Sequence, residues 1–482
     1  MTDLSTLEPT EVWRWFGEIC KIPRPSKKEG KMVDFLLRFG QQHNLETLSD
    51  KAGNVVIRKP ATPGKENSKT IVLQSHIDMV CEKTADSQHN FDKDAIVPVI
   101  DGGWVHATET TLGADDGIGV ATQLAILSAK DISHPPIECL FTVDEETGLT
   151  GANSLDGNML HGRTLINLDS EDEGQIFIGC AGGINTVGRL KIMRQTLETD
   201  CIAFVINVKG LRGGHSGDDI HKGFGNAIKI LNRFLWNATR LFGANLCNFD
   251  GGNLHNAIPR NATATFTVDC RFESDLDRFF NNFKYDICQE LKYTESQIVI
   301  ELKKTDLPKE TMTRSCQTRL LNAIYSCPNG PIAMSHALPR LVETSTNLAS
   351  VKTNDSEIEI VTSQRSSVES AKADIAAMVE SVFVQAGMEV EHSDGYPGWE
   401  PNPQSAILST AVASYKQLFG KEPEVKAIHA GLECGLFLKK IPQMDMISIG
   451  PTLRGVHSPS ERIEIKTVKM FYDFLIDILK HF

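Results

Sequence analysis

The sequence predicts an α/β fold in which a mixed, mostly parallel sheet lies between helices, with a second, α+β domain inserted into it. Four short apolar segments, at 70–74, 137–143, 164–168 and 446–449, each run into polar residues or a loop. Near-continuous apolar strands of this kind are typical of a sheet that is covered on both faces. The chain has 482 residues, more than one hydrophobic core normally serves, so more than one domain is expected.

Helices are expected early in the chain, where they would cover this sheet. Residues 11–20 and 28–43 have helical periodicity, and the second segment places Met32, Phe35, Leu36 and Phe39 on one face. The run after residue 119 is also typical of a helix.

The middle of the chain has a different pattern and is predicted to be the inserted domain. We place it at 187–399, between the parts at 1–186 and 400–482 that form the first domain. Its strands alternate polar and apolar residues and lack the His, Asp or Glu ends seen in the flanking parts. Its expected helices and strands are 225–242, 367–385, 262–269 and 357–362. Its length leaves room for two similar α+β halves.

The composition excludes several classes of function. The formal net charge is -13, whereas nucleic acids and anionic membranes select basic surfaces, so neither is expected as a partner. No apolar run approaches the ~20 residues of a membrane helix, and the N-terminus does not have the pattern of a signal peptide. The 11 cysteines form no Cys-x-x-Cys pair, which favours reduced thiols and a cytoplasmic protein.

The polar residues after the apolar strands suggest a metal centre. His76 and Asp78 are two positions apart, so their side chains point to the same side of the chain. Imidazole is a good zinc ligand, and a carboxylate behind the ring would fix its tautomer. Because ligands bind beyond the carboxyl ends of the strands in open α/β sheets, the position supports this interpretation.

Two pairs of adjacent acidic residues extend the predicted centre. Asp115 and Asp116 stand between glycines before a helix, so one can cap the helix while the other, which we assign as Asp115, bridges two metal ions. After the strand at 137–143, Glu145 and Glu146 can divide the roles of general base and metal ligand. We assign Glu145 as the base and Glu146 as the ligand.

Asp169 and His457 complete the predicted ligand set. Each follows an apolar strand and is expected at the same sheet edge as the others. The charges support the combination: two Zn²⁺ ions bring four positive charges, and the carboxylates of Asp115, Glu146 and Asp169 with one hydroxide bring four negative ones. Zinc suits this set of ligands, although Mn²⁺ or Co²⁺ can also occupy it.

Five motifs, in this order, resemble those of the aminoacylase/carboxypeptidase-like dinuclear zinc peptidases. They are His76-Ile-Asp78, Gly113-Ala-Asp115-Asp116-Gly117, Asp144-Glu145-Glu146-Thr-Gly148, Asn167-Leu-Asp169 and Val456-His457-Ser458. The similarity also includes Gly213-Gly-His215-Ser-Gly217 and His429-Ala-Gly-Leu-Glu433-Cys-Gly435, so it extends over the whole chain.

The resemblance implies a catalytic domain that holds two Zn²⁺ ions and an inserted lid domain through which relatives commonly form homodimers. It implies that Asp115 bridges the ions, that His76, Glu146, Asp169 and His457 bind them in a pairing left open, and that Asp78 orients His76. It also implies hydrolysis of dipeptides, including Xaa-His dipeptides, by a zinc-bridged hydroxide with Glu145 as base.

The resemblance further implies three lid residues that bind the small peptide substrate. His215 looks like the histidine that holds the scissile carbonyl, and Asn256 and Arg365 look like substrate contacts. An arginine can bind a peptide's terminal carboxylate through two parallel hydrogen bonds.

Three alternatives remain at this point. A deacylase of N-acyl amino acids or a tripeptidase would need the same ligands, since specificity depends on the pocket. A metal-binding protein without activity would not need Glu145 and Asp78. A hydrolase with Ser216 as nucleophile is disfavoured because the sequence around it lacks the Gly-x-Ser-x-Gly pattern.

Overall fold

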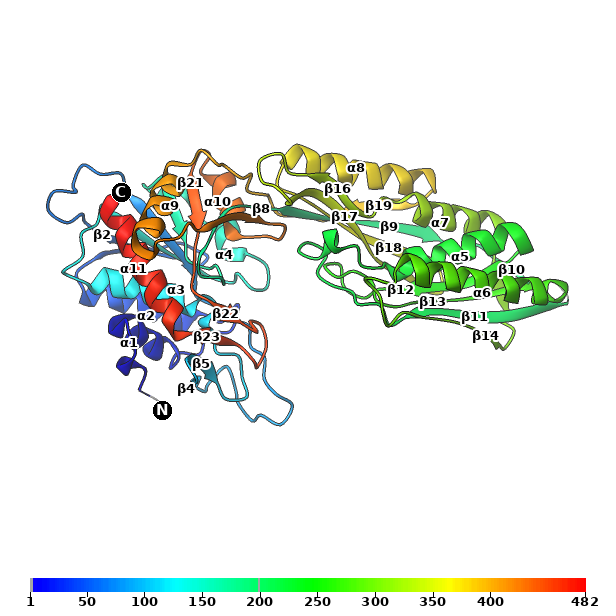
Figure 1. Cartoon of the computed structure of the whole chain (residues 1–482), viewed down its shortest axis with the longest axis horizontal. Helices are drawn as coiled ribbons and strands as arrows, with labels where there is room; N and C mark the ends of the chain where they lie inside the picture. The colour runs from blue at the N-terminus through cyan, green and yellow to red at the C-terminus, as the bar shows by residue number, and fades with distance from the viewer. Residues whose placement is uncertain (1–2, 198–199) are drawn as a thin grey trace. The chain divides into compact units, whose positions relative to one another are not determined.

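The computed structural model describes residues 3–197 and 200–482, which divide into two compact units (Figure 1). The first comprises Met1–Cys180, Pro401–Ala427 and Leu432–Phe482, and the second comprises Ala181–Glu400 and Ile428–Gly431. The first boundary therefore lies before residue 186, because the strand Gly182–Lys191 pairs along its whole length with a strand of the second unit. A four-residue segment near the C-terminus also belongs to the second unit.

The first unit is built on an eight-stranded sheet in the order β1-β2-β6-β3-β7-β21-β8-β20. Its four central strands, β6, β3, β7 and β21, run parallel, and antiparallel strands flank them. The bounds are β1 (Glu46–Ser49), β2 (Val55–Lys59), β3 (Ile71–His76), β6 (Ile137–Thr142), β7 (Thr164–Asn167), β8 (Gln175–Cys180), β20 (Glu424–Ile428) and β21 (Asp445–Ser448). The predicted mixed sheet with a parallel centre is confirmed.

Both faces of this sheet are covered, because every residue of β3, β6 and β7 is buried. The covering elements include α1 (Thr10–Ile19), α2 (Gly30–Gln42), α3 (Ala114–Ser128), α4 (Thr150–Ser154), α9 (Ala406–Phe419), α10 (Glu433–Lys440) and α11 (Ile465–His481). The apolar face predicted for α2 is buried at Met32, Leu36 and Phe39. A smaller sheet contains β4 (Pro98–Asp101), β5 (Trp104–Ala107), β22 (Leu453–Arg454) and β23 (Arg462–Glu464).

The second unit is an antiparallel sheet with helices, and its elements form two halves of the same order. One half runs β11-α5-β12-β13-α6-β14 along the chain and the other β9-α7-β17-β18-α8-β19. In the sheet the strands stand as β14-β11-β13-β12-β17-β18-β9-β19, so each half places its strands in the same relative order, read from opposite edges. Ala262, Ala264, Phe266 and Val268 of β13 are buried, and Phe266 packs on Phe234 of α5.

The bounds of these elements are β9 (Gly182–Lys191), β11 (Cys201–Lys209), α5 (Ala227–Phe242), β12 (Asn245–Gly251), β13 (Ala262–Asp269), α6 (Glu273–Glu290), β14 (Val299–Thr305), α7 (Arg314–Ser326), β17 (Val342–Thr353), β18 (Glu357–Ser366), α8 (Glu369–Gln385) and β19 (Glu389–His392). β16 (Gly330–Met334) pairs with β17, and β10 (Arg194–Thr196) pairs with β15 (Glu310–Met312). Short 3₁₀ turns are Leu4–Thr6, Gly157–Met159, Ile220–Lys222 and Cys270–Phe272.

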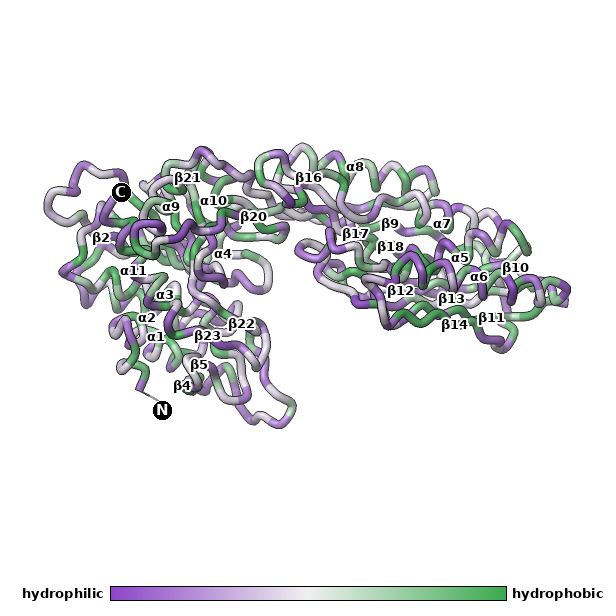
Figure 2. Tube along the Cα trace, in the orientation of Figure 1, coloured by the Kyte–Doolittle hydropathy of each residue, from purple (hydrophilic) through white to green (hydrophobic). Residues whose placement is uncertain are grey.

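Apolar residues are spread over the elements of both units (Figure 2). Within residues 3–197 and 200–482, no helix combines the length and the apolar character needed to cross a membrane.

Candidate metal centre

The predicted ligands of the first unit meet at the carboxyl end of its sheet. His76 is the last residue of β3, which lies between β6 and β7 and runs parallel to both. The loop after β6 carries Glu145 and Glu146, and Asp169 lies two residues beyond the end of β7. Because the carboxyl ends of parallel neighbours share one edge, these four side chains gather without any long connection.

Asp115 lies between the two histidines of the cluster. One of its carboxylate oxygens is 3.1 Å from His76 Nε2 and the other is 3.1 Å from His457 Nε2. Its neighbour Asp116 instead accepts a hydrogen bond from the backbone N–H of Gly119, at the start of the regular part of α3. The two adjacent acids therefore occupy different environments, one at the helix start and one in the cluster.

His457 reaches the cluster from the loop between β22 and β23. Its Nε2 lies 3.1 Å from Glu146 Oε2 as well as 3.1 Å from Asp115. Its backbone φ is +61°, a region that few residues other than glycine adopt and that is often found at functional sites.

The ligand atoms form two overlapping groups that share Asp115. One group is His76, Asp115 and Asp169, and the other is Asp115, Glu146 and His457; within each, the atoms lie within 4.8 Å of one another. In these two groups His76 stands with Asp169 and His457 stands with Glu146.

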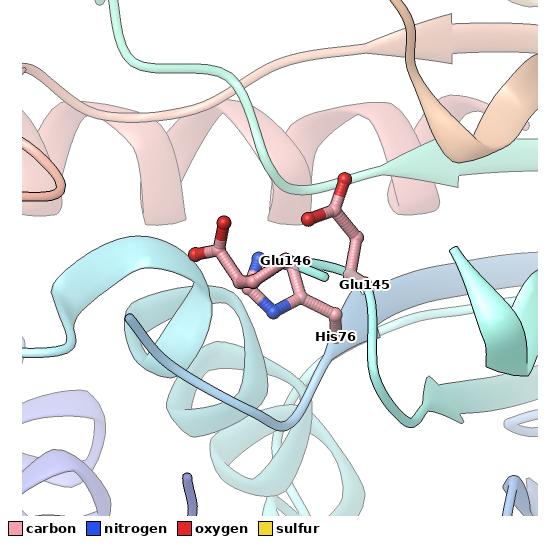
Figure 3. A group of neighbouring side chains, drawn as sticks. All are labelled: His76, Glu145 and Glu146. Carbon is pink, nitrogen blue, oxygen red and sulfur yellow. The ribbon is translucent and has the colours of Figure 1, made fainter. Parts of the chain in front are cut away.

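Glu145 lies next to these groups, and Figure 3 shows its side chain together with those of Glu146 and His76. A third group, His76, Glu145 and Glu146, also has ligand atoms within 4.8 Å of one another. Burial, together with the nearby carboxylates of Glu433 and Glu146, raises the pKa of Glu145 to about 8 even though His76 opposes the shift.

Asp78 supports the cluster from beneath. It is fully buried, and one oxygen lies 3.3 Å from His76 Nδ1. Its carboxylate also accepts hydrogen bonds from the backbone N–H groups of Glu145 and Glu146 and from Ser26 Oγ. One side chain thus orients the imidazole and the loop that carries both glutamates.

The charged groups of the cluster shift one another's pKa values strongly. Burial raises the pKa of Asp169 well above its ordinary value. Asp115 is also buried, but its hydrogen bonds with His457 and His76 outweigh the burial and lower its pKa. The carboxylates of Asp115 and Glu146 raise the pKa of His457 to about 11.

The residues present fit two divalent metal ions. Imidazole nitrogens with carboxylate oxygens are a donor set that suits zinc and similar ions. Among the residues that the structure describes, none of Asp115, Glu145, Glu146 and Asp169 pairs with a lysine or arginine, and the buried Oε1 of Glu146 has no hydrogen-bond partner. Buried carboxylates without such partners require a cation.

The predicted substrate residues lie in the second unit, where His215, Asn256 and Arg365 belong to neighbouring segments. The segment of His215 pairs with Ala257, and the N–H of Ser216 donates to the carbonyl of Asn256. Arg365 is 6% exposed on β18 and donates from Nη1 to Tyr396.

His429 joins this group, although the sequence did not single it out as a site residue. Its Nε2 lies 2.7 Å from Ser345 Oγ, and Ser345 is opposite Arg365 in the sheet. Burial, with Arg365 as the next cause, lowers the pKa of His429 to about 3, so the ring is neutral near pH 7. The neighbours of His429 include Arg365 and His215, which are distant in the sequence, so the motif around His429 did not predict this environment.

Ser216 has the environment of a structural residue. Its side chain is 1% exposed, and within the described part of the chain its hydroxyl has no hydrogen-bond partner. A nucleophilic serine requires an adjacent base and access to substrate, so this geometry argues against a serine hydrolase.

Comparison with known proteins agrees with the geometry of the first unit. Residues 72–481 match peptidase family M20/M25/M40. The chain belongs to this family. The cytosol non-specific dipeptidase of Escherichia coli is 41% identical over 480 residues, which are 100% of this chain and 99% of that protein. The family predicted from the sequence motifs is therefore confirmed.

Solved structures extend the comparison to the fold of this peptidase. An aminoacylhistidine dipeptidase from Vibrio alginolyticus has a TM-score of 0.95 and 41% identity, covering 100% of this chain and 98% of that one. The motifs also predicted a closer resemblance to the bacterial cytosolic non-specific dipeptidase, or aminoacyl-histidine dipeptidase (peptidase D), which these matches confirm. Aminopeptidase PepT from Bacillus cereus, 16% identical with a TM-score of 0.57 and 98% of each chain covered, shares the fold.

A row of buried polar side chains lies behind the metal centre of this peptidase and was missed by the sequence reasoning. Gln74 donates to Glu433, and Thr142 donates to the same Glu433 oxygen. Asn167 donates to Gln74 and accepts from Ser448. These bonds link the carboxyl ends of β6, β3, β7 and β21 side by side. The only signal in the sequence was the polar residue within each apolar strand.

Proposed function

We propose that this protein is a dipeptidase that binds two divalent metal ions and uses Glu145 as its general base. The observation that carries the proposal is the position of Asp115, whose two oxygens face His76 and His457 in two overlapping ligand groups. Both named dipeptidases cover essentially the whole chain at 41% identity, which supports dipeptides as the substrate class.

The ligand roles follow from the two groups. We propose that His76 and Asp169 hold one ion, that Glu146 and His457 hold the other, and that Asp115 bridges them. Ions bound there would polarise the peptide carbonyl and lower the pKa of a coordinated water. Asp78 keeps Nδ1 of His76 turned inward, which leaves Nε2 free to bind.

Glu145 performs the proton transfers in this proposal. It takes a proton from the attacking water and gives it to the nitrogen of the leaving amine. Glu145 is suited to the role because its carboxylate lies within 4.8 Å of ligand atoms of His76 and Glu146, while its backbone N–H donates to Asp78 (Figure 3).

The second unit is proposed to bind the ends of the substrate. Arg365 has a buried Nε without a hydrogen-bond partner among the described residues, so its guanidinium can donate to a carboxylate. We assign it to the terminal carboxylate of the peptide, and His215 and Asn256 to the region of the scissile carbonyl. A neutral His429, linked to Ser345, adds a polar group to this region without adding charge.

The proposal is tested by a substrate panel with metal analysis. Purified protein loaded with Zn²⁺ is assayed on an Xaa-His dipeptide, a tripeptide and an N-acetyl amino acid. We expect the dipeptide to be cleaved with the highest kcat/KM and metal analysis to give two ions per chain. Preference for the tripeptide or for the acylated amino acid would refute the substrate class.

The role of Glu145 is tested with Glu145→Gln, compared with Glu82→Gln as a control at an exposed position. The first variant should retain both metal ions while kcat falls by about 10²–10⁴, the usual contribution of general acid–base catalysis. The control should behave as the parent. Loss of metal from Glu145→Gln would instead make Glu145 a ligand.

Zinc as the native metal, a homodimer and a cytoplasmic location belong to the same proposal. Zinc is supported by the donor set, and Mn²⁺ or Co²⁺ are the competing ions. The homodimer is supported by large apolar side chains exposed in the second unit, such as Tyr293 at 90% and Leu254 at 61%. Elemental analysis and light scattering test the first two. The cytosolic name of the Escherichia coli relative supports the third.

A further inference from the structure

Two buried side chains of opposite charge surround the loop that carries Asp115. Glu461 is 2% exposed and Arg24 is 3% exposed. Among the residues that the structure describes, neither makes an ion pair with the other or with any other side chain. Buried charges are rarely stable without partners, so the groups that neutralise them indicate what they do.

Within residues 3–197 and 200–482, the Glu461 side chain accepts hydrogen bonds only from backbone amides of this loop. One carboxylate oxygen accepts from the N–H groups of Leu112 at 2.7 Å and Gly113 at 3.0 Å. The other accepts from Ala114 at 2.7 Å and Asp115 at 3.3 Å. Four consecutive amides thus converge on one carboxylate, which fixes the direction of the chain up to the residue assigned as the metal bridge.

Arg24 binds carbonyl groups of the same region. Nη1 donates to the carbonyls of Ile77 at 3.0 Å and Asp78 at 2.6 Å, and Nη2 donates to the carbonyl of Gly113. The guanidinium therefore connects the segment after His76 to the loop before Asp115. A planar group with several fixed donors can do this, whereas a lysine ammonium cannot reach all three carbonyls with the same geometry.

Two glycines of the loop motif make room for this arginine. A Cβ atom on Gly113 would lie 2.6 Å from Arg24 Nη2, and a Cβ on Gly117 would lie at the same distance. Gly113 also has φ +69°, which favours glycine. Both glycines are thus explained by the packing of the guanidinium.

We propose that Arg24 and Glu461 are positioning residues that together hold the backbone of Leu112–Asp115, so that the Asp115 carboxylate faces His76 and His457. The inference rests on the proposed dinuclear centre. Glu461 also lies four residues after His457, so the same side chain ties the loop of one ligand to the segment that carries another. Neither residue contacts the predicted ligand atoms directly.

The experiment measures Zn²⁺ affinity by competition with a chromophoric chelator, in the full-length chain. Glu461→Gln places an NH₂ group against backbone N–H donors, and we expect it to weaken Zn²⁺ binding by roughly 10–100-fold, as is typical for groups that orient ligands. Glu464→Gln, three positions away and with no side-chain hydrogen bond within the described part of the chain, is the matched control and should bind as the parent. Glu461→Asp keeps the charge and should give an intermediate affinity.

A second pair of variants keeps the test decisive. Arg24→Lys retains the charge but loses the shared carbonyl contacts, and Arg38→Lys is its control at an exposed position. For Glu461→Gln and Arg24→Lys saturated with Zn²⁺, kcat should fall while KM on an Xaa-His dipeptide stays within about twofold, because uniform substrate binding is unaffected. A residue that only stabilises the fold would lower the melting temperature of the metal-free chain without this change in Zn²⁺ affinity.

The inference is overturned if both variants bind Zn²⁺ as the parent does, if the controls lose as much affinity, or if neither variant folds without metal. Failure of the parent chain itself to bind Zn²⁺ would refute the proposed function instead, so the two failures are distinguishable.

Discussion

The substitution Asp78→Asn tests how far the metal centre depends on a group that binds no metal. Asp78 is fully buried, lies 3.3 Å from His76 Nδ1, and accepts hydrogen bonds from Ser26 and from the amides of Glu145 and Glu146. Asparagine preserves the shape but replaces one acceptor oxygen with an NH₂ donor. In either orientation of the amide, at least one backbone N–H loses its acceptor.

The size of the effect can be worked from these contacts. Leaving a buried N–H without a partner costs about 1–3 kcal/mol. Burial opposes ionisation of Asp78, but His76 and the backbone N–H of Glu145 lower its pKa from 3.8 to about 2, and a change of this size corresponds to about 2–3 kcal/mol of interaction that the neutral amide lacks. The two effects overlap because they involve the same donors. We therefore expect a loss of roughly 10–100-fold in Zn²⁺ affinity and in kcat.

The assay compares Asp78→Asn with Asp86→Asn, an exposed aspartate in the same part of the chain. Chelator competition gives the Zn²⁺ affinity, steady-state kinetics on an Xaa-His dipeptide gives kcat and KM, and circular dichroism checks that both variants are folded. A folded Asp78→Asn variant with the affinity and kcat of the parent would refute the reasoning.

Three further outcomes are expected. Gly450→Ala should destabilise the chain by about 3 kcal/mol or more, because its Cβ would lie 1.6 Å from the carbonyl oxygen of Ser170; thermal melting checks this, with Gly30→Ala, which has open space around it, as the neutral control. Burial keeps His429 unprotonated in the folded state, where its pKa is about 3 in place of 6.5. The unfolded chain binds a proton at this histidine below about pH 6.5, so the free energy of unfolding should fall by up to about 4–5 kcal/mol as the pH drops towards 3. Urea titrations of the metal-free chain should show that the free energy of unfolding falls less steeply between pH 6.5 and 3 in His429→Gln than in the parent. An unchanged pH dependence would contradict this assignment. Removal of metal by a chelator should abolish turnover and lower the melting temperature, and Zn²⁺ should restore both; turnover that persists without metal would refute the dinuclear mechanism.

The sequence by itself determined which strands form the centre of the first sheet. The strands 71–76, 137–142 and 164–167 each contain an apolar run, and a strand buried on both faces requires such a run whatever its neighbours are. The same reasoning located the polar residues that follow each strand. Local composition therefore identified both the strands and the ends at which a ligand binds.

The sequence also predicted different roles for the adjacent residues Asp115 and Asp116, one in the ligand cluster and one at the start of a helix. Their order before a helix is a local property, and the hydrogen bond from Gly119 to Asp116 expresses it. The first domain boundary was predicted less well, since β9 continues directly from β8 and only its pairing with β18 assigns it to the second unit.

Only the tertiary structure could show which of the predicted ligands lie side by side and which groups contact their loops. Whether His457 pairs with Glu146 or with Asp169 depends on the path of a loop hundreds of residues away in the chain, and no local pattern encodes that distance. The same is true of Arg24 and Glu461, because a buried charge reveals its role only through the amides or carbonyls it meets. A hydrophobic pattern is encoded in a short segment of sequence. Contacts between predicted ligands, or between a buried charge and backbone groups, depend instead on which distant segments the fold brings together.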